Sequence, residues 1–377
     1  MTKLLKLFIC VLLVILTTIG CTSRWEIAVN DSSGNLNTIT KKSVGIHIDN
    51  SVEEVESIPL GQLLYASGFS LIDQIKITDQ YGIDTIYNWD DISEYTTINE
   101  SGVILIEDVE ITADIITVSE SPLLNEISYS IMDISPTAAS VLGLPALSNA
   151  QGQNVILENE NWNQVVMILM DGVQYEKFST MVNDGFLPFF KNQDNINMGL
   201  TVYPPITTSA TAALLTGTNP EQNGVFGYGY RSTELTTLFD LAVNNGLSVV
   251  AVEGASLPFN LRNAETILSG DKDGNGFSDD NVLSNSLEII QNKLPDLLYI
   301  HFHEVDDMGH SYGENSMEYE DALIRVDNYI EQIYQSLPEY TLIIIFADHG
   351  MHTTSDGGNH GTLTAHDLII PIIFITK

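Results

Sequence analysis

The chain has 377 residues, of which 44% are hydrophobic, which is enough apolar sequence for one large domain or two ordinary ones. It contains 14 Lys and Arg residues against 50 Asp and Glu residues, for a formal net charge of −36 at pH 7. This balance excludes nucleic-acid binding through a basic surface. It is typical of the solvated surface of a salt-adapted or secreted protein; recruitment of a basic partner is the alternative.

Residues 1–20 have the layout of a secretory signal peptide. Lys3 and Lys6 precede an apolar stretch that is too short and too poorly flanked for a stable membrane span, and small residues follow it. The "TIGC" sequence at 18–21 resembles the lipobox of prokaryotic lipoproteins, which implies lipidation at Cys21 and an extracytoplasmic protein anchored to the membrane. Plain secretion is the alternative. Because Cys10 lies in the signal, cysteine nucleophiles and thiolate zinc sites are excluded from the mature chain.

Residues 24–130 contain short β-branched runs separated by Gly, Asn and Asp, which predict a small β-rich domain with a helix at 59–68. Residues 131–163 are predicted to form a helix and a linker. From residue 164 to 377, nearly continuous apolar runs alternate with segments of helical period. This pattern predicts an α/β domain with a mainly parallel central sheet flanked by helices.

Carboxylates and imidazoles follow the predicted strands of this second domain. In such sheets ligands bind at the carboxyl ends of the strands, and Asp and His are the ligands that zinc takes when thiolates are absent. One such residue alone is more commonly a helix cap or part of a turn. Eight of them at several strand ends predict a metal site: Asp171, Glu304, Asp306, Asp307, His310, Asp348, His349 and His360.

A Pro-containing loop leads into a predicted small-residue helix in "YPPITTSATAALLTG", residues 203–217. The hydroxyls of Thr207, Thr208 and Ser209 therefore lie at a helix N-terminus. A hydroxyl there can cap the helix, or it can attack a phosphoryl group held by the local amides and a metal ion. The segment alone does not distinguish the two roles.

The motifs "MDG", "PPITTSATAALLTG", "EVDDMGHSYG", "ADHGM" and "GNHG" occur in an order that resembles the alkaline phosphatase superfamily, most closely its type I phosphodiesterase/nucleotide pyrophosphatase branch. The resemblance covers about residues 164–377 and implies an alkaline-phosphatase-like fold with two zinc ions; such ligands also suit manganese or iron. It implies one ion at Asp306, His310 and His360, and the other at Asp171, Asp348 and His349, beside and in contact with the nucleophile. The family's nucleophile lies nine residues before the Thr of "TG", which is Thr216 here, so the resemblance assigns Thr207.

The resemblance implies hydrolysis of a phosphoric-ester substrate through a phospho-threonine intermediate, with phosphodiesters favoured. Three alternatives remain open: a phosphomonoesterase, a phosphotransferase of the cell envelope, and a catalytically silent surface binding protein. Phosphodiesterases of this branch carry Asn three residues after the nucleophile, where this chain has Ala210, which weakens the nucleotide-pyrophosphatase assignment. The sequence does not indicate an oligomeric state.

Two further segments carry predictions. "DKDGNGFSDD", residues 271–280, begins like a calcium loop, but the twelfth position is Val282, which excludes a full EF-hand. A partial calcium site at Asp271, Asp273, Asn275 and Asp279 is one interpretation, and an Asp/Gly turn is the other. "SIMDISPTAASVLGLPAL", residues 130–147, resembles a helix that superfamily members place after the last strand, which predicts a rearranged chain in which this helix packs on the catalytic domain. An unrelated amphipathic helix is the alternative.

Overall fold

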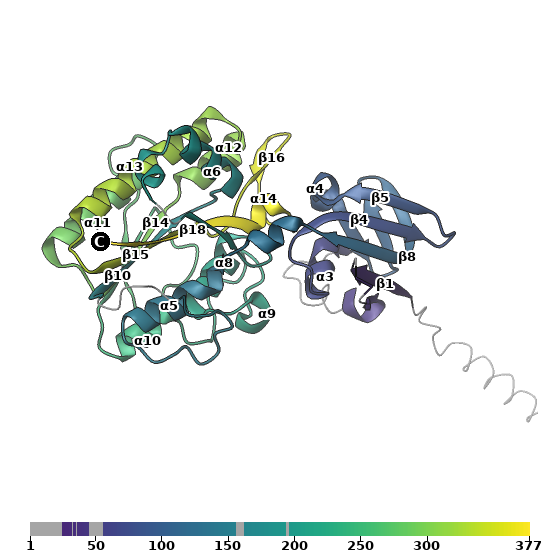
Figure 1. Ribbon diagram of the computed structural model, residues 1–377, viewed down its shortest axis with the longest axis horizontal. Helices are drawn as coiled ribbons and strands as arrows, with labels where there is room; N and C mark the ends of the chain where they lie inside the picture. Colours follow the sequence, from purple (N-terminus) through teal and green to yellow (C-terminus); the bar gives the residue numbers. More distant parts are fainter. Residues whose placement is uncertain (1–24, 32, 35, 45–55, 156–161, 194–195) are drawn as a thin grey trace, which may run out of the picture. The chain divides into compact units, whose positions relative to one another are not determined.

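The computed structural model describes residues 25–377 except 32, 35, 45–55, 156–161 and 194–195, and the described chain divides into two compact units. The first comprises the described residues up to Gly68 together with Gln74–Ser119, and the second comprises Phe69–Asp73 and Glu120–Lys377 (Figure 1). The predicted signal segment 1–20 and Cys21 lie outside the described residues. Within the described part of the chain, no helix has the length and apolar content required to cross a membrane.

The first unit is β-rich, as predicted. Its sheet has the order β2-β1-β8-β7-β6-β3, and β4 pairs with both β8 and β5. The helix predicted at 59–68 is α3, Leu60–Ala66. Ala113, Ile116 and Val118 of β8 are buried, as are Ile27 of β1 and Trp89, and these side chains belong to the core of the first unit. The strands are β1 (Glu26–Asp31), β2 (Leu36–Thr40), β3 (Ser57–Pro59), β4 (Ile72–Asp79), β5 (Asp84–Asn88), β6 (Thr96–Asn99), β7 (Val103–Ile106) and β8 (Val109–Glu120).

The second unit contains the predicted mainly parallel sheet. Its strand order is β13-β12-β14-β10-β15-β18-β11-β9, and β18 alone among these strands runs antiparallel to its neighbours. Every residue of β14 and β15 is buried, which explains their nearly continuous apolar sequences. The strands are β9 (Tyr129–Ser130), β10 (Gln164–Met170), β11 (Ile196–Leu200), β12 (Val249–Glu253), β13 (Glu265–Leu268), β14 (Leu297–Phe302), β15 (Thr341–Phe346) and β18 (Ile369–Thr376).

Helices cover both faces of this sheet (Figure 1). One face carries α6 (Tyr175–Asp184), α11 (Asp279–Lys293), α12 (Glu304–Tyr312) and α13 (Met317–Ser336). The other carries α5 (Ile134–Val141), α8 (Thr207–Thr216) and α10 (Leu238–Asn244). The hairpin of β16 (His352–Thr354) and β17 (Gly357–Asn359) packs on α12, and the short α14 (Ala365–Leu368) leads into β18. The second unit is thus a layered α/β domain of the predicted class.

The segment before residue 164 belongs to this second unit. Strand β9 pairs parallel with β11, and α5 packs against α8. The Ser135 hydroxyl donates to the Leu214 carbonyl, and the Gln151 N–H donates to the Gly217 carbonyl at 2.7 Å. These bonds attach the segment to the helix that begins with Thr207.

Candidate active site

The candidate residues meet at the carboxyl edge of three adjacent strands. Asp171 directly follows β10, α12 follows β14, and Asp348 and His349 follow β15. His360 reaches the same edge through the β16–β17 hairpin, which packs on α12. Because β14, β10 and β15 are parallel neighbours, their carboxyl ends bring residues that are distant in sequence to one place.

Asp171, Asp348 and His349 form a first group whose ligand atoms all lie within 4.8 Å of one another. Nε2 of His349 is 3.2 Å from Oδ1 of Asp171 and 3.5 Å from Oδ2 of Asp348. The Thr207 hydroxyl, at the start of α8, is 3.3 Å from the same nitrogen. The structure therefore brings the candidate nucleophile to this group.

Asp306, His310 and His360 form a second group beside the first. Nε2 of His310 is 3.4 Å from Oδ2 of Asp306 and 3.2 Å from Nε2 of His360, which is 3.7 Å from Oδ1 of Asp306. The His360 ring stacks on His349 with a centroid separation of 3.7 Å. Ligand atoms of Asp306, His349 and His360 also lie within 4.8 Å of one another, so the two groups adjoin.

The three histidines share one arrangement of their ring nitrogens. In each ring Nδ1 lies at hydrogen-bonding distance from a backbone carbonyl: 2.9 Å for His349, 3.2 Å for His310 and 2.9 Å for His360. An Nδ1–H that donates to a carbonyl leaves the Nε2 lone pair free, and all three Nε2 atoms point into the groups. This arrangement is the one that a metal-binding histidine requires.

Three carboxylate oxygens in the site are buried and accept no hydrogen bond: Oδ1 of Asp171, Oδ1 of Asp306 and Oδ2 of Asp348. A buried anionic oxygen without a donor is costly unless a cation compensates it. Carboxylate oxygens and imidazole nitrogens without thiolates are a donor set that zinc accepts. The residues present therefore fit two adjacent metal ions.

The same crowding shifts the pKa values of the site. Burial and the nearby negative charge of Asp171 raise the pKa of Asp306 well above its usual range and that of Asp348 to about 6. Burial and the neighbouring His349 lower the pKa of His360 to about 2, which keeps this ring neutral. Carboxyl groups this close together cannot all ionise without a cation nearby. The pKa shifts therefore follow from the same geometry as the carboxylate oxygens that accept no hydrogen bond.

Thr207 is the first residue of the ten-residue helix α8, all of which is buried. The preceding residue, Ile206, makes no side-chain hydrogen bond to the start of the helix. Its side chain therefore leaves the first backbone N–H groups of α8 available to another acceptor. The positive end of the helix dipole therefore lies at the Thr207 hydroxyl, where it favours an anionic group. Ala210, in place of the expected Asn, is fully buried within the same helix.

Sequence reasoning missed four residues at this edge. His301 is the second-to-last residue of β14, His303 follows that strand, and Glu253 is the last residue of β12. Nδ1 of His301 lies 3.0 Å from Oε2 of Glu253, and Nε2 of the same ring lies 3.0 Å from Oδ2 of Asp171. The Tyr228 hydroxyl is 3.3 Å from Nε2 of His360. Two histidines spaced i, i+2 in an apolar strand were the available signal for His301 and His303. Nothing in the sequence around Glu253 or Tyr228 matches a motif.

Three of the four residues of the suggested calcium loop lie together, because the backbone nitrogen of Asn275 is 3.2 Å from Oδ1 of Asp271 and 3.1 Å from Oδ1 of Asp273. Asp271 accepts the N–H groups of Gly274 at 2.7 Å and Gly276 at 3.0 Å, as in an Asp/Gly turn. Asp279 instead starts α11, where its carboxylate accepts the N–H groups of His303 and Glu304. Asp279 therefore supports α12, and a partial calcium site in this loop stays a prediction.

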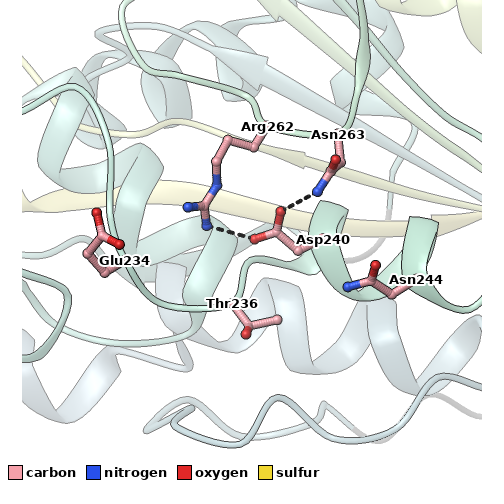
Figure 2. Close-up of a pocket in the computed structure, with 6 residues that line it drawn as sticks. All are labelled: Glu234, Thr236, Asp240, Asn244, Arg262 and Asn263. Atoms are coloured by element: carbon pink, nitrogen blue, oxygen red, sulfur yellow. Dashed lines mark hydrogen bonds and ion pairs between the residues drawn. The ribbon is translucent and has the colours of Figure 1, made fainter.

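A separate surface pocket lies beside the start of α10 (Figure 2). Within it Asp240 accepts from Arg262 at 2.8 Å and from Asn263 at 2.7 Å, and it also caps its own helix with Thr237. None of the candidate metal ligands lines this pocket, and its Asp240, Arg262 and Asn263 are already bonded to one another. The pocket is lined by Glu234, Thr236, Asp240, Asn244, Arg262 and Asn263.

Among solved structures, the chain is similar in fold to phosphonoacetate hydrolase from Sinorhizobium meliloti in complex with phosphonoacetate. The identity is 16% and the TM-score 0.42, over 52% of this chain and 59% of that one. It is also similar to the C-terminal periplasmic domain of EcEptC from Escherichia coli in complex with Zn, with 14% identity and a TM-score of 0.41, over 62% and 77% of the two chains.

Among curated relatives, GPI ethanolamine phosphate transferase 3 of Eremothecium gossypii is 32% identical over 126 residues, which are 33% of this chain and 12% of that protein. GPI ethanolamine phosphate transferase 2 of Schizosaccharomyces pombe is 27% identical over 251 residues, 55% and 31% of the two chains. The chain thus spans less than a third of the length of these relatives. Residues 165–246 and 255–369, more than half of the chain, match the type I phosphodiesterase/nucleotide pyrophosphatase family. The chain therefore belongs to this family, within the alkaline phosphatase superfamily, as its motifs predicted.

Proposed function

We propose that the protein cleaves phosphodiesters through Thr207, in a site that binds two metal ions. The observation that carries this proposal is the position of the Thr207 hydroxyl, 3.3 Å from Nε2 of His349 and at the N-terminus of α8. Family membership supports phosphoric esters as the substrate class. The lipobox-like sequence ending at Cys21 supports an extracytoplasmic, membrane-anchored location.

The two groups described above supply the proposed ligands. Asp306, His310 and His360 would hold one ion, and the other would be held by Asp171, Asp348, His349 and the Thr207 oxygen. Zinc fits this donor set, as do manganese and iron. Bound ions would supply positive charge that lowers the pKa of an adjacent hydroxyl and stabilises negative charge on phosphoryl oxygens.

In the proposed reaction, Oγ1 of Thr207 attacks phosphorus. The bond between Oγ1 and phosphorus forms, the bond from phosphorus to one ester oxygen breaks, and the Thr207 proton passes to solvent. The departing alcohol takes a proton from solvent. The amides at the start of α8 favour the anionic phosphoryl group at this position. The oxygen of an acceptor, water or an alcohol, then attacks the same phosphorus: its bond to phosphorus forms, the bond from phosphorus to Oγ1 breaks, the acceptor loses a proton to solvent, and Oγ1 takes a proton back.

In the proposed function, water is the acceptor of the second step, and the enzyme is a phosphodiesterase. The curated relatives favour a second candidate, because they are named as ethanolamine phosphate transferases. In that case an alcohol replaces water in the second step, and the phosphorylated head group moves to a new hydroxyl. Both reactions use the same first step, so only the products distinguish them.

The test is hydrolysis of bis-p-nitrophenyl phosphate and of p-nitrophenyl phosphate by zinc-loaded protein, with Thr207→Ala as the control. We expect faster cleavage of the diester and a loss of at least about a thousandfold in kcat/KM for the variant. Faster cleavage of the monoester would identify a phosphomonoesterase. The Ala210 that stands in place of Asn would then have indicated the substrate better than the family resemblance does. A phosphorylated alcohol formed from an added acceptor would identify a transferase, and a folded, zinc-loaded protein that cleaves nothing would be a binding protein.

A further inference from the structure

One buried carboxylate joins the two chain segments that carry His349 and His360. These two candidate ligands belong to different groups of the site, and the β16–β17 hairpin lies between them in sequence. Their rings stack at a centroid separation of 3.7 Å, so a shift of either segment changes the distance between the two groups. Whatever holds the two segments at the base of the hairpin therefore sets the spacing of the groups.

Asp367, in α14, makes this connection. Its side chain is fully buried, and its Oδ1 lies 2.7 Å from Nδ1 of His352, on the segment that follows His349. Its Oδ2 accepts the backbone N–H of Thr362 at 2.8 Å and the Thr362 hydroxyl at 2.7 Å, on the segment that follows His360. Each carboxylate oxygen thus holds the segment that leaves one of the two groups.

The main chain of α14 also contacts the His349 segment. The Gly350 N–H donates to the Asp367 carbonyl at 2.8 Å. A Cβ added at Gly350 would lie 1.9 Å from the His366 carbonyl oxygen, so only glycine allows this close approach. The His349 segment therefore has an attachment to α14 that does not use the carboxylate. The His360 segment depends on the carboxylate more strongly, because both Thr362 donors end on Oδ2.

The hydrogen bonds of the Asp367 carboxylate lead away from its own helix. An aspartate in the first turn of a helix commonly caps that helix. Here, however, His352 lies in β16, and Thr362 lies in the loop between β17 and α14. The carboxylate is therefore placed to connect the segments of the candidate site.

We propose that Asp367 is a positioning residue that fixes the spacing of the two candidate metal groups. Its loss would loosen chiefly the group of Asp306, His310 and His360, because the segment of the other group stays attached through Gly350. This role rests on the proposed function, which does not itself use Asp367. The bonds of the Asp367 side chain end on neighbours of the candidate ligands, so it acts on those ligands through the backbone.

The test is zinc binding by the chelator-treated full chain, measured by competitive titration with a chromophoric chelator, with circular dichroism as the check on folding. We expect two zinc ions in the wild type. Asp367→Ala should weaken one ion about 10- to 100-fold, as does the loss of groups that orient metal ligands, and leave the other within about threefold. In a His310→Ala background, where the second group already lacks a ligand, Asp367→Ala should change the affinity of the remaining ion by less than about threefold.

Further variants separate position from charge and from stability. Asp367→Asn keeps an oxygen that can accept both Thr362 donors, so it should bind both ions within about threefold of the wild type. Asp327→Ala is the matched control and should keep wild-type zinc affinity, because this buried carboxylate accepts the N–H groups of Phe189 at 3.2 Å and Phe190 at 3.0 Å, which are not candidate ligands. If Asp367→Ala does not fold, Thr362→Val, which removes one donor, should weaken the same ion about two- to tenfold.

Three results would overturn the proposal: wild-type zinc affinities in Asp367→Ala, an equal loss for both ions, or an Asp367→Asn variant as weak as Asp367→Ala. Fewer than two ions in the wild type would overturn the two-metal site and this proposal together. Catalysis is a separate outcome. A wild type that cleaves the diester, with unchanged zinc affinities in Asp367→Ala, keeps the proposed function and loses the positioning role. Selective loss of one ion in Asp367→Ala, with no cleavage of either ester by the wild type, does the reverse.

Discussion

The carboxylate of Asp279 holds the start of α12, the helix that carries Asp306 and His310. Asp279 is fully buried, and it accepts the N–H groups of His303 at 3.0 Å and Glu304 at 2.9 Å. In Asp279→Ala both buried donors lose their acceptor, at a cost of about 1 to 3 kcal/mol each. Burial raises the pKa of Asp279, so removing a desolvated carboxylate offsets part of this loss.

We therefore expect Asp279→Ala to lower the free energy of unfolding of the second unit by about 2 to 3 kcal/mol, and Asp279→Asn, which keeps one acceptor oxygen, by about half as much. The assay is urea unfolding of chelator-treated protein followed by far-UV circular dichroism, since bound metal would add its own stabilisation. Asp280→Ala, the next residue of the same helix, is the control and should change the free energy by less than about 0.5 kcal/mol. If Asp279→Ala had the same free energy of unfolding as the wild type, the reasoning would be refuted.

Three further outcomes follow from the geometry. Gly172 has φ +69°, and a Cβ there would lie 2.7 Å from Oδ1 of Asp306, so Gly172→Ala should weaken zinc binding at least about tenfold in a competitive titration. Gly143→Ala, with φ +65° and open space around it, should leave affinity unchanged, and equal affinities in the two variants would contradict this view. Burial raises the pKa of Asp327 to about 6, above its unfolded value, so its favourable contribution to stability is present below about pH 4 and is lost as the pH rises to 6. Asp327→Asn should therefore gain stability relative to the wild type between about pH 4 and pH 6. Urea unfolding at several pH values measures this difference, and a difference that does not change with pH would contradict the prediction. Chelation should abolish ester cleavage and lower the melting temperature, and zinc at a hundred times its Kd should restore about 2.7 kcal/mol of stability, which thermal unfolding measures.

The fold class could be predicted from the sequence, and so could the residues that gather at the sheet edge. Buried parallel strands are long apolar runs, and the residue after each run must lie at the carboxyl edge, as Asp171 and Asp348 do. The family motifs fixed the order of the segments that meet there. These inferences need only local patterns, which is why they survive the comparison with the structure.

The remaining features depend on contacts between segments that no local pattern reports. Glu253 ends a strand like many others, and only the pairing of β12 with β14 places it against His301. Asp279 was grouped with the calcium-like loop because it is close to Asp271 in sequence, yet its hydrogen-bond partners lie 24 and 25 residues further along the chain. The antiparallel direction of β18 also has no signature, because a strand buried on both faces reads the same in either direction.

The place of β18 in the sheet has a consequence for the order of folding. It lies between β15 and β11, pairing with both, although it is later in sequence than every other described strand. During synthesis the ribbon of β9 and β11 therefore has no hydrogen-bonded connection to β15 until residues 369–376 arrive. Closure of the sheet is then a late event between distant segments, which slows folding and leaves two strand edges exposed to aggregation until the last strand is inserted.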